Sequence, residues 1–195
     1  MYNTSSSYSA IVIGVSAGGL SALTTLLSPL PAYYPVPLII VQHRSQDQSE
    51  LLEEVLQTRC AIKIKQADEK EMVKGGIAYF APPGYHLLIE GDHTFSLSSE
   101  EYDAHSRPSI DVLFESAAEV YGQRLVGIIL TGANSDGAAG TTRIREQGGL
   151  TIAQDPQEAP YPTMPEAAIS KGVITFIWSL SEIKKFIMEL PLRDR

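Results

Sequence analysis

Three short apolar runs constrain the fold of this chain most strongly. They are AIVIG at residues 10–14, VPLIIVQ at 36–42 and LVGIIL at 125–130. The runs are rich in β-branched residues, and apolar and polar residues do not alternate in them, which indicates strands that are buried on both faces. Such strands are typical of a parallel sheet covered by helices. The three runs therefore predict an α/β fold.

Segments with helical apolar spacing separate these strands. Helices are expected over 20–27, 50–57, 110–121, from the Gly-rich turn at 131–140 to about 147, and over 181–190. A short helix is also expected after the loop that contains Pro156, Pro160, Pro162 and Pro165. Further strands are expected at 150–154 and 173–177. The alternation of strands and helices predicts a doubly wound, mostly parallel sheet with helices on both faces.

Residues 62–98 show a different sequence pattern. Short strand-like stretches bounded by turn signals follow one another, and the last two, at 85–90 and 93–98, are joined around Gly91-Asp92. This pattern predicts an antiparallel hairpin attached to the parallel sheet.

The length of 195 residues fits one domain. Without a linker or an internal repeat, we expect a flexible leader over 1–9, a single domain over 10–190 and a tail over 191–195. The 15 basic and 23 acidic residues give a formal net charge of −8, and no basic run could follow nucleic acid phosphates. No apolar run approaches the roughly 18 residues of a membrane span, so no membrane insertion is expected. The single cysteine, Cys60, indicates a reducing compartment, so we expect a cytoplasmic protein.

Polar residues follow three of the predicted strands. Ser16, His43 and Asp136 each stand just beyond an apolar run. Ligands of open α/β sheets bind at the carboxyl ends of the strands, so these three side chains are expected at one edge. A serine hydroxyl becomes a nucleophile when an imidazole accepts its proton and a carboxylate orients that imidazole. The turn from Gly14 to Gly18 also fits the G-x-S-x-G pattern, which exposes a serine between strand and helix.

Each of these residues has a simpler interpretation when taken alone. Ser16 is a common type of helix N-cap, His43 is a hydrogen-bonded residue at a strand end, and Asp136 is the start of an Asx-turn. A dinucleotide fingerprint is disfavoured because Ser16 stands where its second glycine is required. His86 and His93 flank the hairpin turn without a third ligand, so no metal site is predicted.

Several separated motifs together resemble the catalytic domain of the chemotaxis protein-glutamate methylesterase family. They are IVIGVSAGGLSAL, LIIVQH, SRPSIDVLF, LTGANSDGAAG, GGLTIAQDP and MPEAAI, and the similarity extends from about residue 10 to 190. The resemblance implies a doubly wound α/β fold and a triad of Ser16, His43 and Asp136. It implies hydrolysis of γ-glutamyl methyl esters on the cytoplasmic helices of chemoreceptors, in some members also deamidation of glutamine there, and no cofactor.

Four further residues are candidates for the oxyanion and the substrate. The backbone NH groups near Ala17, Gly18 and Ala133 would hold the oxyanion, and Arg107 would hold an anionic or carbonyl group or else be a solvated loop residue. Ala17 and Ala133 stand where threonine and methionine are usual in the family, which makes both positions small here.

The resemblance also sets an expectation about regulation. A typical member carries an N-terminal receiver domain, and we expect none in this chain, which would be either stand-alone or a piece of a fusion with the receptor methyltransferase. The alternative to an enzyme is a non-catalytic receptor-binding or scaffolding module of the same fold.

Overall fold

Seven parallel strands form one sheet in the order β3-β4-β2-β1-β7-β8-β9. The structure, a computed structural model, describes residues 8–44, 51–100 and 107–190. The strands of this sheet are β1 (Ala10–Val15), β2 (Leu38–Gln42), β3 (Lys63–Gln66), β4 (Ile77–Phe80), β7 (Leu125–Ile129), β8 (Leu150–Gln154) and β9 (Phe176–Trp178). All of their pairings are parallel. The predicted doubly wound α/β fold is therefore confirmed.

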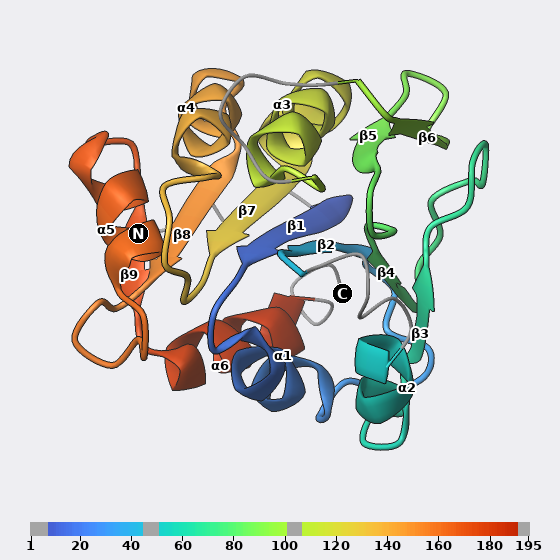
Figure 1. Ribbon diagram of the computed structural model, residues 1–195, viewed down its shortest axis with the longest axis horizontal. Helices are drawn as coiled ribbons and strands as arrows, with labels where there is room; N and C mark the ends of the chain where they lie inside the picture. Colours follow the sequence, from blue (N-terminus) through green and yellow to red (C-terminus); the bar gives the residue numbers. More distant parts are fainter. Residues whose placement is uncertain (1–7, 45–50, 101–106, 191–195) are drawn as a thin grey trace.

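Helices cover both faces of the sheet (Figure 1). On one face lie α1 (Gly19–Leu27), α2 (Leu51–Gln57) and α6 (Leu180–Glu189). On the other lie α3 (Ile110–Tyr121), α4 (Ala138–Glu146) and α5 (Thr163–Ser170), and a short 3-10 turn, η2 (Gly122–Arg124), connects α3 to β7. Residue 50, where we expected the second helix to begin, lies outside the described residues.

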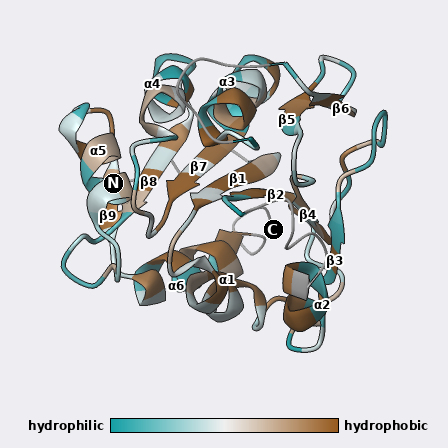
Figure 2. Ribbon diagram, viewed as in Figure 1, coloured by the Kyte–Doolittle hydropathy of each residue, from teal (hydrophilic) through white to brown (hydrophobic). Residues whose placement is uncertain are grey.

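The central strand β1 shows why the apolar runs predicted burial on two sides. Ile11, Ile13 and Val15 belong to the core beneath α1 and α6, whereas Ala10 and Val12 belong to the core beneath α3. Successive side chains of a strand point to opposite faces, so a strand between two helical layers must be apolar at every position. Figure 2 accordingly shows hydrophobic central strands and more hydrophilic outer surfaces of the helices.

The hairpin of β5 (His86–Ile89) and β6 (Phe95–Ser98) is antiparallel, as predicted. It differs from the expectation in its attachment, because its two strands form a separate sheet that does not hydrogen-bond to the seven-stranded one. Leu87, Ile89 and Phe95 instead belong to the same apolar core as α3. Backbone hydrogen bonds join it to the segment between β3 and β4 as well, because the Lys70 NH donates to the Phe95 carbonyl at 2.8 Å and the Phe95 NH donates to the Glu71 carbonyl at 2.9 Å. The hairpin is thus attached through both packing and this connecting segment.

The carboxyl ends of β2, β1 and β7 are neighbours in the sheet. The chain runs from β1 to β2 in one direction along the sheet and from β7 to β8 and β9 in the other, so the strand order reverses at β1. Loops that leave a sheet at such a reversal diverge and open a crevice between them. The three loops that carry Ser16, His43 and Asp136 all begin at this place.

The ends of the domain differ slightly from the expectation. Tyr8 and Ser9, which we assigned to the leader, pack onto the domain: the Ser9 NH donates to the Arg124 carbonyl, and the Tyr8 ring lies 6.4 Å from that of Phe186. Residues 1–7 and the predicted tail over 191–195 lie outside the described residues. Among the helices of the described ranges, none is long and apolar enough to cross a membrane.

Candidate active site at the ends of three neighbouring strands

Ser16 lies in a tight turn between β1 and α1. The Ser16 NH donates to the Thr131 carbonyl at 3.0 Å, and the Gly19 NH donates to the Ser16 carbonyl at 3.0 Å. Gly18 adopts φ +80°, a left-handed conformation that favours glycine. The turn therefore has the sharp bend that the G-x-S-x-G pattern predicted, and it holds Ser16 at the carboxyl edge of the sheet.

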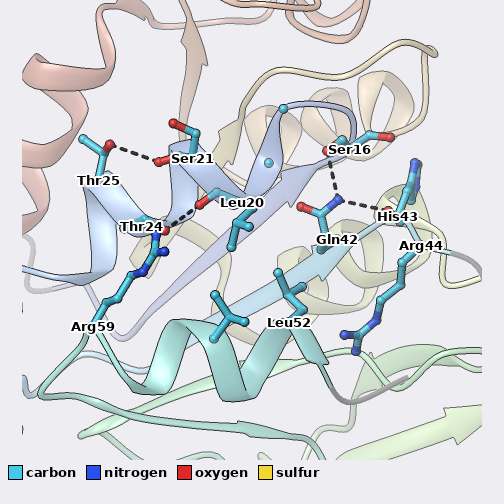
Figure 3. Close-up of a pocket in the computed structure, with 13 residues that line it drawn as sticks. Ser16, Leu20, Ser21, Thr24, Thr25, Gln42, His43, Arg44, Leu52 and Arg59 are labelled. Carbon is cyan, nitrogen blue, oxygen red and sulfur yellow. Dashed lines mark hydrogen bonds between the residues drawn. The ribbon is translucent and has the colours of Figure 1, made fainter. Parts of the chain in front are cut away.

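His43 lies beside this turn. Its NH donates to the Val15 carbonyl at 3.0 Å, so the end of β2 is tied to the end of β1. Figure 3 shows the Ser16 hydroxyl directed toward the His43 ring. Within the described residues, the Ser16 hydroxyl makes no hydrogen bond to that ring.

Asp136 lies behind His43, with its side chain 1% exposed. His43 Nε2 is 2.8 Å from Asp136 Oδ2. The carboxylate also accepts the Ile110 NH at 2.7 Å, the Asp111 NH at 3.0 Å and the Ser109 hydroxyl at 3.0 Å. It therefore caps the N-terminus of α3, where the helix dipole favours a negative charge.

These contacts determine the charge of Asp136 and the tautomer of a neutral His43 ring. Burial by itself raises the pKa of Asp136, but the hydrogen bonds from His43 and from the NH groups of Ile110 and Asp111 outweigh it and hold the pKa below its ordinary value. The carboxylate is then ionised at neutral pH and can only accept. His43 must donate from Nε2, which leaves the lone pair of the neutral ring on Nδ1.

Sequence reasoning missed two amide side chains of this site. Gln42 Nε2 donates to the Ser16 and His43 carbonyls, both at 2.9 Å, and so ties the two loops together (Figure 3). A Cβ at Gly19 would stand 1.8 Å from Gln42 Oε1, which explains why a glycine begins α1. Asn134 Nδ2 lies 3.1 Å from His43 Nδ1. Only their places in the sequence could have indicated these two residues, because Gln42 directly precedes His43 and Asn134 stands two positions before Asp136.

A groove of about 720 Å³ opens at Ser16 and His43 and runs between α1 and α2. Its described lining contains two arginines and no acidic residue. Arg44 is paired with Glu53 at 2.5 Å, whereas exposed Arg59 makes no ion pair with any described carboxylate. The lining residues are Ser16, Gly18, Gly19, Leu20, Ser21, Thr24, Thr25, Gln42, His43, Arg44, Leu52, Val55 and Arg59.

Comparison with known proteins identifies the family. The model of the CheB methylesterase family matches residues 11–187. The chain belongs to the CheB methylesterase family. The family and the enzyme class predicted from the motifs, a carboxylic-ester hydrolase, are confirmed by this match and by the relatives that follow.

Similar proteins agree with this membership. A Leptospira interrogans relative, to which protein-glutamate methylesterase and protein-glutamine glutaminase activities are provisionally assigned, is 51% identical over 94% of this chain and 95% of its own length. The protein-glutamate methylesterase/protein-glutamine glutaminase 1 of Carboxydothermus hydrogenoformans is 39% identical, over 91% of this chain but 54% of its own length. The crystal structure of the Thermotoga maritima CheB methylesterase catalytic domain superposes with a TM-score of 0.89 at 30% identity, over 94% of this chain and 99% of that one.

The backbone NH groups predicted for the oxyanion are available in this CheB-family site. Within the described part of the chain, those of Ala17, Gly18 and Ala133 donate to no acceptor. The Thr131 hydroxyl donates to the Ala17 carbonyl at 2.9 Å and accepts the Tyr161 NH at 3.0 Å, so it joins the loops on this side of the turn. These hydrogen bonds hold the turn in place, and they leave the NH groups of Ala17, Gly18 and Ala133 without an acceptor among the described residues.

Arg107 is the remaining candidate. Its guanidinium donates to the Ser99 carbonyl, at the end of the hairpin strand β6, and Arg107 is absent from the described lining of the groove. The structure brings Ser16, His43, Asp136, Ala17 and Gly18 together, and Arg107 precedes Ser109, whose hydroxyl donates to Asp136, by two positions, so a role for Arg107 in substrate binding stays a prediction. Ala133, in contrast, lies in the loop between β7 and Asp136.

Proposed function

We propose that this chain hydrolyses γ-glutamyl methyl esters on the cytoplasmic helices of chemoreceptors, and that Ser16, His43 and Asp136 carry the reaction. The observation that carries the proposal is the buried Asp136–His43 pair, 2.8 Å apart, beside a serine in a strand-to-helix turn. Because these receptor helices lie in the cytoplasm, we propose that the chain acts there.

In this mechanism the Ser16 oxygen attacks the ester carbonyl carbon while His43 Nδ1 accepts the serine proton. Asp136 stabilises the imidazolium that forms. The tetrahedral intermediate then loses its methoxy group, which takes the proton from His43 and leaves as methanol. Water attacks the acyl-enzyme in the same way, so that the glutamate carboxylate and Ser16 are regenerated. The ester carbonyl oxygen becomes negative in both steps, and the unpaired NH groups of Ala17, Gly18 and Ala133 are the proposed donors to it.

The groove between α1 and α2 is the proposed binding place for the receptor helix. Leu20, Leu52 and Val55 offer apolar contacts, and Leu20 is 41% exposed. The chain has a net charge of −8, yet the described lining of this groove contains two arginines and no acidic residue. Because opposite charges attract across an interface, the groove favours an acidic partner. Arg59, which pairs with no described carboxylate, is then the group that contacts a carboxylate near the ester.

Glutamine deamidation fits the same geometry. The amide carbonyl would occupy the position of the ester carbonyl, and ammonia would leave in place of methanol. The poorer leaving group needs the proton from His43 more strongly, so we expect deamidation to be slower than ester hydrolysis on the same receptor.

The test is methanol release from a methylated chemoreceptor cytoplasmic fragment incubated with the full chain. We expect steady release together with new glutamate carboxylates at the methylated positions, detected by mass spectrometry of receptor peptides. A non-catalytic module would bind the fragment and release no methanol beyond the enzyme-free control. That result would overturn the proposed function.

A further inference from the structure

Both nitrogens of the His43 ring are occupied in this structure. Asp136 Oδ2 lies 2.8 Å from Nε2, and Asn134 Nδ2 lies 3.1 Å from Nδ1. The Ser16 hydroxyl, although directed toward the ring, is not bonded to it within the described residues (Figure 3). The nucleophile and its base are thus neighbours that are not yet connected.

The orientation of the Asn134 amide follows from its second contact. Its Oδ1 accepts the Asp136 NH at 3.2 Å, so the NH₂ group must face His43. Because Nε2 donates to an ionised carboxylate, Nδ1 carries the ring's only lone pair. Asn134 therefore donates to the very atom that has to accept the serine proton.

In the part of the chain that the structure describes, the other charged groups near the ring do not compete for Nδ1. Arg44, the next residue in the chain, is turned to Glu53 on α2. On the α3 side, His86 Nδ1 accepts the Ser109 NH, and Asp111 Oδ1 accepts the Gly140 NH. Of the described side chains, Asn134 alone hydrogen-bonds to Nδ1.

We propose that Asn134 is a positioning residue that occupies the basic nitrogen of His43 until substrate binds. Asn134 is exposed, and His43 lines the groove, so a substrate that reaches the His43 ring can displace the amide. Displacement frees Nδ1 for the Ser16 hydroxyl. This inference rests on the proposed triad. While Asn134 occupies Nδ1, His43 cannot accept the Ser16 proton, so Ser16 is less reactive without substrate than with it.

A fluorophosphonate reagent tests the inference without any receptor. Ser16 Oγ displaces fluoride from phosphorus and its proton passes to His43, so the second-order labelling rate measures how well the pair is connected. Asn134→Ala removes the competing donor, and we expect labelling at pH 7 to become about threefold to tenfold faster, the range of one net hydrogen bond. Asn134→Asp presents a carboxylate that stabilises the protonated ring. We expect that variant to label more slowly at pH 7, with the acid limb of its pH profile moved upward by about one unit.

Opposite effects of the two variants distinguish this role from a structural one. Ser135→Ala, an exposed neighbour in the same loop, is the control and should label like the wild type. Nitrogen-15 spectra should show the His43 ring protonated at Nε2 in the wild type and in Asn134→Ala. An unchanged or slower Asn134→Ala, or two variants that change in the same direction, would overturn the inference even if methanol release succeeds. A wild type and an Asn134→Ala variant that both fail to label would overturn the triad as well.

Discussion

Replacing Asp136 by asparagine separates the two roles of this side chain. Among its described contacts, the carboxylate accepts hydrogen bonds from His43, Ile110, Asp111 and Ser109. An asparagine in its place has one acceptor oxygen and one NH₂ group, so one backbone NH must face another donor. The orientation of the amide then decides which tautomer His43 keeps.

The contacts favour the orientation that keeps the reactive tautomer. With the amide oxygen at the Oδ2 position, the Ile110 NH and His43 Nε2 stay paired, Ser109 can accept from the new NH₂, and only the Asp111 NH is left facing a donor. With the amide reversed, the Ile110 NH faces a donor, and His43 would present an Nδ1–H to the Asn134 NH₂. The reversed orientation thus has two donor–donor contacts rather than one.

The expected loss of activity therefore comes from the missing charge. His43 Nε2 and Asp136 Oδ2 are 2.8 Å apart. For charge centres about 4 Å apart and an effective dielectric constant of about 20, the attraction to the imidazolium is about 4 kcal/mol. Since each ~1.4 kcal/mol of barrier is tenfold in rate, kcat is expected to fall about 10³-fold. The unpaired Asp111 NH is expected to lower the free energy of unfolding by about 1–3 kcal/mol.

The assay is methanol release from methylated receptor fragment at saturating substrate, with urea unfolding followed in parallel. Asp111→Asn is a useful comparison, because Asp111 lies at the same helix end and its carboxylate accepts the Gly140 NH. A loss of kcat below about tenfold for Asp136→Asn, only ~1.4 kcal/mol of barrier, would refute the reasoning and leave Asp136 as a helix cap.

Three further expectations follow from the same contacts. Gln42→Leu removes the donor shared by the Ser16 and His43 carbonyls, so kcat should fall about tenfold or more with little change in KM, measured by methanol release. Arg59→Glu places a negative charge in the groove and should raise KM for methylated receptor severalfold at low salt, with a smaller effect at high salt and with kcat nearly unchanged. The pKa of Asp136 is lower in the folded chain than in the unfolded one, so its stabilising contribution is complete above the unfolded value of about 3.9 and is lost as the pH falls through the folded value. Urea unfolding should therefore show the stability difference between wild type and Asp136→Asn narrowing below about pH 4.

The sheet and its helices could be predicted because their signals are local. An uninterrupted apolar run between helical segments has few alternatives to a buried parallel strand, and β8 covers the residues expected for it. The strand expected over 173–177 instead appears as Phe176–Trp178, at the edge of the sheet, where burial on two faces no longer restricts the pattern. The hairpin was recognisable from its turn, but its attachment through α3 depends on packing that no local pattern encodes.

The candidate site shows the same division. Ser16, His43 and Asp136 were found because each follows an apolar strand, and parallel strands end at one edge. The cap that Asp136 provides to α3 could not be found in this way, because the residues it contacts there are 25–27 positions away. The contact between Asn134 and His43 spans 91 positions. Arg107 was a candidate because of its charge, and the structure shows that charge directed at a carbonyl of the hairpin.

The central claim is that Ser16 is the nucleophile of an ester hydrolase, and one side-by-side measurement tests it most directly. Methanol release from methylated receptor fragment is followed for the full chain, for Ser16→Ala and for Ser21→Ala, a serine that lines the same groove on α1. We expect Ser21→Ala to retain most of the wild-type rate and Ser16→Ala to lose at least about 10³-fold, as expected when a nucleophile is removed. Release by Ser16→Ala at the wild-type rate would contradict the account.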